Sequence, residues 1–328
     1  MVYILRRLGL FAATLWACLT INFFLPRLMP GNPAIAMMAR YRGRVSPQTI
    51  HALEIAFGVS NHQNVLIQYL EYLGNTAQGR FGTSLTFFPE SVDKVIITAL
   101  PWTLGLVGLT TILSFVLGTL LGMLSAWRRG GRILDSTLPP VFIIFNNFPP
   151  FTLGLLLILF FAVVLGWLPL GFAYGGGQVP ALTWQFVGNV LGHALLPSLT
   201  LLVVLIGGWI LTMRNNMITT LAEDYVRMAR AKGLSPWRIM VSYAGRNAIL
   251  PNFTGFAMSM GFVVSGAIFI EYVFSYPGVG YMLLQAVSNE DYALMQALFL
   301  MITVAVLVSV LAADLINAWL DPRARTAS

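Results

Sequence analysis

Basic and apolar side chains alternate in residues 224–234, in a pattern that suits binding to a charged surface. If this stretch is helical, four apolar side chains fall on one face: Leu221, Tyr225, Met228 and Ala229. Three basic side chains lie mostly off that face: Arg227, Arg230 and Lys232. Helices that lie on anionic lipid have this pattern, and so do helices that insert an apolar face into a groove of a partner protein. The residues alone leave both alternatives open.

The same segment is predicted to form two helices with a sharp turn between them. Residues 214–249 read RNNMITTLAEDYVRMARAKGLSPWRIMVSYAGRNAI, and from Leu221 onward strong helix formers predominate. Gly233 interrupts this run, and Ser235-Pro236 supplies a new N-cap followed by proline in the first turn. We therefore expect a helix, a turn and a helix that lie on a membrane surface and do not cross it.

Motifs for catalysis are missing from the sequence. A nucleotide-binding P-loop needs Gly-Lys-Ser or Gly-Lys-Thr, but the only two lysines, Lys94 and Lys232, follow Asp93 and Ala231. Neither His-Glu-x-x-His nor Gly-x-Ser-x-Gly occurs. Cys18 is the single cysteine, which excludes a disulfide framework or a cysteine-based metal cluster within one chain. The chain is therefore predicted not to be an enzyme and to hold neither a metal nor a cofactor.

The composition is typical of a membrane protein. Of 328 residues, 57% are hydrophobic and only 9% are charged, whereas soluble domains carry about 25% charged residues. Six apolar segments are predicted to cross the bilayer as helices: residues 8–28, 99–126, 138–165, 194–213, 250–270 and 294–319. We therefore predict an all-α polytopic membrane protein with six transmembrane helices. The net charge of +7 does not indicate nucleic acid, because the basic residues punctuate the apolar runs and form no single face.

The positions of the basic residues predict the orientation. With six spans, both termini lie on the same side, and placing them in the cytoplasm puts 13 of the 19 Lys and Arg residues inside. The outer loop at residues 166–192 then contains no Lys or Arg. Because cytoplasmic loops carry an excess of these residues, both termini are predicted to be cytoplasmic.

Two further segments could contribute to function. Outside the membrane, short amphipathic helices are expected after Ser46-Pro47 and around Leu66, Ile67, Leu70 and Leu73, the second ending at Gly74. They could pack over the span ends or form a platform for a solute-binding protein. In the third span, Asn146 and Asn147 precede two prolines. This stretch could be a kink held by amide hydrogen bonds, or it could line a substrate path.

Several motifs together resemble one family of transport proteins. The stretch DYVRMARAKGL at 224–234 is similar to the cytoplasmic loop of binding-protein-dependent importer permeases, where this loop docks on an ATPase. Further motifs are similar to those of the oligopeptide, dipeptide and nickel branch of this family. They are RRL at 6–8 with PGNP at 30–33, GRFGTS at 79–84, EYVFSYPGVG at 271–280, DY at 291–292 and LDPR at 320–323. The general loop opens Glu-Ala-Ala where this chain has Arg227-Met228-Ala229, and this difference also resembles the peptide branch.

The resemblance implies a type I ABC importer permease fold in the cytoplasmic (inner) membrane. Residues 1–98 would hold the first transmembrane helix and an extracytoplasmic segment, and 99–325 the transporter domain with its coupling loop at 214–249. It implies as partners a second, homologous permease, two ATPase subunits that bind ATP and Mg, and an extracytoplasmic solute-binding protein. The ATPase-coupling residues would be Tyr225, Arg227, Met228, Ala229, Arg230, Ala231, Lys232, Gly233 and Leu234, with Asn146 and Asn147 as candidates for the translocation path.

The substrate and one rival function stay open at this point. Oligopeptides or dipeptides are the expected substrates, with oligosaccharides or nickel as alternatives in the same importer class. An ion-coupled secondary transporter is the rival function, and such proteins place acidic or basic residues at mid-membrane. Only Asp314 lies well inside a predicted span, near its cytoplasmic end. The sequence therefore favours the importer.

Overall fold

A computed structural model describes residues 2–28, 64–127, 137, 140–142, 144, 147–181, 183–265 and 267–320. The helix expected after Ser46-Pro47 and the candidate path residue Asn146 lie outside these ranges. The described backbone is largely helical. In this part of the chain, β-type pairing is limited to an isolated antiparallel bridge between Thr83 and Ser91. The prediction of an all-α protein is confirmed.

Four helical stretches in the described part are long and apolar enough to cross a membrane. They correspond to the first, second, fourth and sixth predicted spans. They are α1 (Val2–Leu28), the continuous helix formed by α5 (Val92–Thr103), a π-helical turn (Leu104–Gly108) and α6 (Leu109–Trp127), α9 (Trp184–Leu221) and α15 (Tyr292–Leu320). The second and fourth spans begin well before the predicted residues, because amphipathic turns extend each apolar run.

The third and fifth predicted spans are less regular. The described part of the third is α8 (Pro150–Leu157) followed by a π-helical segment (Ile158–Val164). The fifth was expected to be continuous over residues 250–270, but α12 (Arg246–Val263) ends before α13 (Ile268–Val273) begins. At the break, the Ser265 hydroxyl donates to the Phe262 carbonyl oxygen at 2.6 Å, a local bond that competes with the helical ladder.

Four further helices lie in the described part of the chain. Two of them, α10 (Asp224–Ala231) and α11 (Pro236–Arg238), form the predicted pair in the 214–249 segment, and α11 continues through a π-helical segment (Ile239–Gly245) into α12. The amphipathic helix α4 (Val65–Ala77) runs past Gly74, so the predicted end at that glycine was wrong by one turn. The sequence did not reveal α14 (Val279–Ser288), which lies between α13 and α15.

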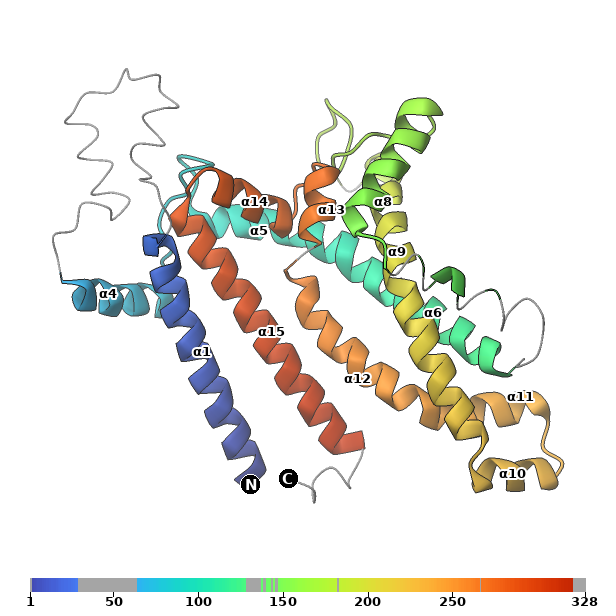
Figure 1. Ribbon diagram of the computed structural model, residues 1–328. Coiled ribbons are helices and arrows are strands. Elements are labelled where there is room, and N and C mark those ends of the chain that lie inside the picture. Colours follow the sequence, from blue (N-terminus) through green and yellow to red (C-terminus); the bar gives the residue numbers. More distant parts are fainter. Residues whose placement is uncertain are drawn as a thin grey trace, which may run out of the picture.

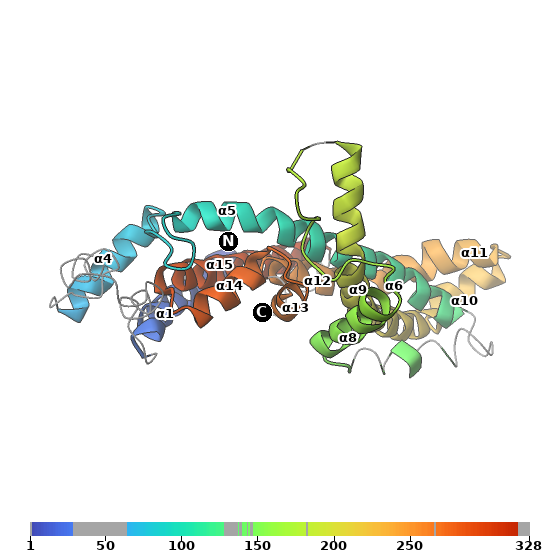
Figure 2. The same ribbon diagram turned by 90° about the horizontal axis from the view of Figure 1, so that it is seen from above.

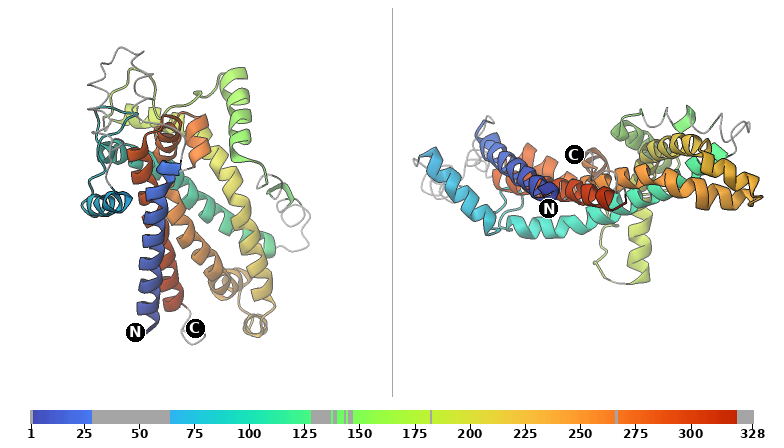
Figure 3. Two further views of the ribbon diagram at one scale, coloured as in Figure 1. Left: turned by 60° about the vertical axis from the view of Figure 1, so that its left-hand side comes forward. Right: turned by 90° about the horizontal axis from the view of Figure 1, so that it is seen from below.

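The long helices stand side by side in an elongated slab (Figures 1 and 2). The start of α1, the end of α15 and the α10–α11 pair lie at one end, here called the terminal end (Figure 1). The opposite end, called the distal end, carries α5, α13 and α14. The first half of α9 projects out of the slab, as the views from above and below both show (Figures 2 and 3).

Small residues bring α6 and α9 into close contact. A Cβ atom at Gly118 would lie 2.6 Å from the Trp209 Cβ, and one at Gly122 would lie 2.5 Å from the Ile210 carbonyl oxygen. Helices in lipid associate through such small-residue contacts because no hydrophobic force drives them together. The two helices are therefore expected to move as one unit.

Polar side chains join α1 to α15. The Asn22 amide nitrogen donates to the Gln296 carbonyl oxygen at 2.8 Å, and the Gln296 amide nitrogen donates to the Asn22 carbonyl oxygen at 3.2 Å. Amide groups inside a membrane require such partners, because lipid offers none. This pair fixes the first span against the last.

Candidate functional site

The α10 helix is anchored to the spans by one narrow apolar face. Val226 and Ala229 are buried on this face, within a cluster formed by the terminal ends of α6 and α9 and by the start of the α11–α12 helix. The cluster comprises Met123, Ala126, Met213, Met217, Val226, Ala229, Ile239, Met240, Ala244 and Ala248. A displacement of α10 would therefore press directly on three membrane helices.

The surface of α10 away from Val226 is open. Tyr225 is 40% exposed and Met228 is 60% exposed, and Trp237 of α11 is exposed as well. Of the four residues predicted to share an apolar face, Tyr225 and Met228 are exposed, Leu221 is half-buried and Ala229 is buried, and the buried Val226 was not among them. Apolar residues occur on both sides of this short helix, so periodicity alone could not tell the buried side from the open one.

Charged residues surround the open surface. Segment 214–249 holds six basic and two acidic residues, and the side chains of Arg227, Arg230 and Lys232 are exposed. The Arg227 guanidinium lies 3.4 Å from the Asp224 carboxylate in an exposed pair, which contributes little to stability. The Asn247 amide donates to the Tyr225 hydroxyl at 2.8 Å and holds that ring against the start of α12.

Gly233 ends α10 in the left-handed conformation, with a φ of +71°. The Gly233 amide donates to the Arg230 carbonyl oxygen at 2.9 Å, and the Leu234 amide donates to the Ala229 carbonyl oxygen at 3.3 Å. This pair of bonds is the Schellman helix ending. An added Cβ at Gly233 would meet nothing within 4 Å, so the backbone conformation, and not crowding, requires glycine here.

A hollow of about 280 Å³ lies between the end of α6 and the turn after α10. Among the described residues that line it, Arg230 is charged, and the others are Trp127, Leu221, Leu234, Pro236 and Ile239. Of the predicted coupling residues, Ala231 and Lys232 are exposed at the end of α10, and Leu234 is half-buried in the turn. Within the described residues, no group of three or more His, Cys, Asp or Glu side chains could hold a metal ion.

The second predicted site is only partly described. Asn147 is exposed, and its backbone amide donates to the Ile144 carbonyl oxygen at 3.3 Å. The two prolines that follow begin α8, with Pro149 as N-cap and Pro150 in the first turn. In the described part of the third span, the proline pair therefore starts a helix and does not kink one.

A polar centre at the distal end was not identified as a site from the residues. Glu271 is fully buried, and its carboxylate accepts hydrogen bonds from the Thr103 hydroxyl at 2.8 Å, the Gly280 amide at 2.7 Å and the Tyr281 amide at 3.2 Å. The Val279 amide donates to the Thr103 hydroxyl oxygen at 2.7 Å. One carboxylate thus joins α5, α13 and the start of α14.

A second buried carboxylate, that of Asp291, lies between the end of α14 and the start of α15. The Asp291 side chain accepts from the Ser84 hydroxyl, from the Thr86 amide at 2.8 Å and, at the start of α15, from the Leu294 amide at 3.1 Å. It ties the loop before α5 to the last span. For Glu271, the signal in the sequence was an acidic residue between Ile270 and Tyr272 near a span end, which indicates a paired and buried group.

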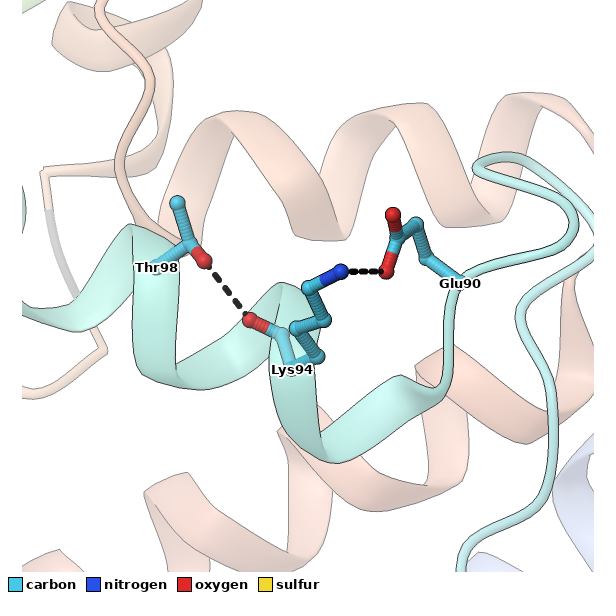
Figure 4. A network of polar contacts seen from close by, with 3 residues as sticks. All are labelled: Glu90, Lys94 and Thr98. Carbon is cyan, nitrogen blue, oxygen red and sulfur yellow. Dashed lines mark hydrogen bonds and ion pairs between the residues drawn. The ribbon is translucent and has the colours of Figure 1, made fainter.

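The start of α5 also carries an exposed ion pair (Figure 4). The Lys94 ammonium lies 2.6 Å from the Glu90 carboxylate, and the Thr98 hydroxyl donates to the Lys94 carbonyl oxygen at 2.8 Å. Both charged side chains are about half exposed or more. Lys94, one of the two lysines of the chain, is therefore engaged in an ion pair at the distal end.

Comparison with known proteins agrees with these features. Residues 118–326 match the family described as binding-protein-dependent transport system inner membrane component. The chain is 35% identical to a di/tripeptide transport system permease protein DppB of Pseudomonas aeruginosa and 32% identical to an oligopeptide transport system permease protein AppB of Bacillus subtilis, over 98% of each chain. It is 30% identical to the oligopeptide permease OppB of Haemophilus influenzae, over 98% of this chain and 99% of that one. The chain therefore belongs to the family of binding-protein-dependent transport system inner membrane components, as a multi-pass permease subunit of an ABC importer and not as an enzyme.

Proposed function

We propose that this permease carries dipeptides or oligopeptides across the inner membrane. The support is similarity over nearly the whole length to permeases named for di- and tripeptides and for oligopeptides. No feature of the described residues favours nickel or oligosaccharides, which were the alternatives from sequence. Residues 99–325 would form the transporter domain, and residues 1–98 would add the first span and the extracytoplasmic segment.

Both termini would be cytoplasmic, together with α10 and α11. The start of α1, the end of α15 and the α10–α11 pair share one end of the slab (Figure 1), and most basic residues belong to that end in the predicted topology. Because positive residues are retained inside, this end would face the cytoplasm. The distal end would then face the binding protein.

ATP and Mg would bind to two partner ATPase subunits, and α10 would carry their motion to the spans. This coupling proposal rests on the two sides of α10: one is open, apolar and rimmed by basic residues, and the other is buried against α6, α9 and α12. The open side suits a groove in a partner. Tyr225, Met228 and the basic residues from Arg227 to Lys232 would make the contact, Ala229 and Leu234 would join α10 to the spans, and Gly233 would set the turn.

The movement would act as a population shift. Closure of the ATPase pair would pull or tilt α10, and the cluster around Val226 would pass this displacement to α6 and α9. ATP would then favour the outward-open state to the extent that it binds that state more tightly. A second, homologous permease would complete the path, with Asn146 and Asn147 as candidates for its lining.

Reconstitution tests this function. Purified complex in lipid vesicles should take up a dipeptide or oligopeptide only when ATP, the ATPases and the cognate binding protein are all present. Nickel and an oligosaccharide serve as control substrates with the same binding protein. Uptake of peptide driven by an ion gradient without ATP would contradict the proposed importer function. ATP-driven uptake of a control substrate but not of peptide would contradict the assignment of peptides as the substrate.

A further inference from the structure

One face of the α4 helix contacts α1. The Tyr69 hydroxyl lies 2.8 Å from the Thr20 hydroxyl, and the Asn22 amide nitrogen donates to the Tyr72 hydroxyl at 3.2 Å. The Arg27 guanidinium donates to the Gln68 side-chain oxygen at 3.0 Å. All these partners belong to the last turns of α1, near the distal end. The α4 helix, called the crossbar below, is thus attached across the end of the first span (Figure 1).

The two other faces of α4 differ sharply. Leu66 is 62% exposed and Leu70 is 60% exposed, and at 100° per residue the half-buried Leu73 falls close to both. Glu71, the only charged residue of α4, and Asn75 fall about 100–180° away from these leucines and are exposed. One side of the crossbar is thus apolar, the opposite side is polar, and the face toward α1 lies between them.

The contacts with α1 fix the depth of α4. They reach from Thr20 to Arg27, and α1 ends at Leu28, so α4 crosses α1 within about 12 Å of its end. Two exposed side chains of α1 at this level, Ile21 and Phe24, are apolar and suit contact with lipid, while the exposed, charged Arg27 lies one residue before the end of the helix. The apolar side of α4 continues this lipid-facing surface.

We propose that α4 lies in the interface of the outer leaflet, with Leu66, Leu70 and Leu73 in the acyl boundary and Glu71 and Asn75 toward water. Amphipathic helices in this position bury their apolar face by about 5–10 Å, which agrees with the depth of the α1 contacts. Tyr69 and Tyr72 lie where aromatic residues are enriched in membrane proteins. The assignment to the outer leaflet rests on the proposed topology, whereas the lipid contact does not. The crossbar fixes the height of the segment before α5 above the membrane.

Quenching by spin-labelled lipid tests the proposal. In a Cys18→Ala background, Leu70→Cys and Glu71→Cys each receive an environment-sensitive fluorophore, and the complete complex is placed in nanodiscs with and without lipid labelled near the headgroup. Both positions are exposed, so both variants are expected to assemble. The probe at position 70 should be quenched several-fold more than the probe at position 71 and should emit at shorter wavelength.

Two outcomes would overturn the inference. Equal quenching at both positions would contradict the proposed orientation of α4. Protection of position 70 from lipid quenching when the purified binding protein is added would identify that protein as the occupant of the apolar face. The measurement requires no transport, so an unquenched probe in a complex that still takes up peptide would refute the lipid contact alone, and quenching in an inactive complex would leave it intact.

Discussion

The two ends of the slab hold their helices together by opposite means. At the distal end, the buried Glu271 and Asp291 carboxylates accept hydrogen bonds from hydroxyl groups and backbone amides of separate helices. At the terminal end, α10 is held mainly by apolar contacts of Val226 and Ala229. Its polar contacts, such as that between Asn247 and Tyr225, lie at the exposed surface.

This difference indicates which end can move. Apolar contacts have no preferred direction, so α10 can shift or tilt while its cluster stays buried. Hydrogen bonds to a buried charge have a defined geometry, and leaving such a group unsatisfied is costly. We therefore expect the distal end to keep its local geometry through the transport cycle while α10 changes position.

The largest effect is expected at Glu271. Glu271→Ala would leave the Gly280 and Tyr281 amides and the Thr103 hydroxyl without their acceptor, and would lower stability by about 3 kcal/mol. Glu271→Gln keeps an acceptor oxygen and should fall between Glu271→Ala and the wild type. Thermal unfolding of the purified complex in detergent, measured as the loss of monodisperse protein with temperature, ranks the stabilities of the wild type and the two variants.

Glu90→Gln is the matched control for this prediction. It removes a carboxylate from the same end of the molecule, but the Glu90 side chain is 45% exposed in its pair with Lys94, so little stability should be lost. A Tm for Glu271→Ala equal to that of Glu90→Gln would show that the buried carboxylate does not hold the distal end together.

The sequence predicted what depends on local pattern. Four of the six spans, the turn at Gly233 and the helix start at Ser235-Pro236 follow from apolar run length and from helix-ending chemistry, which neighbouring residues determine. The break before α13 and the helix α14 were missed. Both are stabilised by contacts far apart in sequence, such as that between Glu271 and Thr103, 168 residues away.

The coupling segment shows the same limit on a smaller scale. The sequence placed α10 and its basic residues, but the apolar face that it predicted, with Tyr225 and Met228, did not include the buried Val226. Both the Val226 face and the Met228 face are apolar, and the choice between them is made by the methionines of α6 and α9. Burial against a distant helix leaves no mark in the local spacing.

Matched truncations on the two faces of α10 should separate anchoring from docking. Val226→Ala removes fully buried methyl groups and should lower stability by about 2 kcal/mol, with weaker coupling as a consequence. Met228→Ala removes an exposed side chain, so the Tm of the isolated permease pair should not change, while peptide-stimulated ATPase activity of the full complex falls. The reverse assignment, with Met228→Ala lowering the Tm and Val226→Ala not, would contradict the proposed orientation of α10.

A smaller stability effect with a specific functional result is expected at Gly233. Gly233→Val forces a β-branched residue into the left-handed region, at a cost of about 1–2 kcal/mol, and should redirect the chain after α10. The complex should still assemble, but peptide should no longer stimulate ATP hydrolysis. Gly233→Asn is the control, because asparagine tolerates this conformation, and it should keep most of the stimulation. Normal coupled turnover in the valine variant would mean that the turn geometry does not matter.

The smallest effect concerns the charges around the open face of α10. The Arg230 side chain is exposed beside the hollow at the end of α6, and charges at the rim of an interface mainly change association rates and their salt dependence. Arg230→Glu should therefore slow assembly with the ATPases and make it more sensitive to salt, with no change in the Tm of the permease pair. Arg238→Glu makes the same charge reversal at the end of α11 and should slow assembly less. The measurement is the association rate of ATPase with nanodisc-held permease pair at low and high salt. Identical rates and salt slopes for the two variants would indicate that the basic residues act through overall charge, and would leave the apolar face of α10 as the determinant of partner choice.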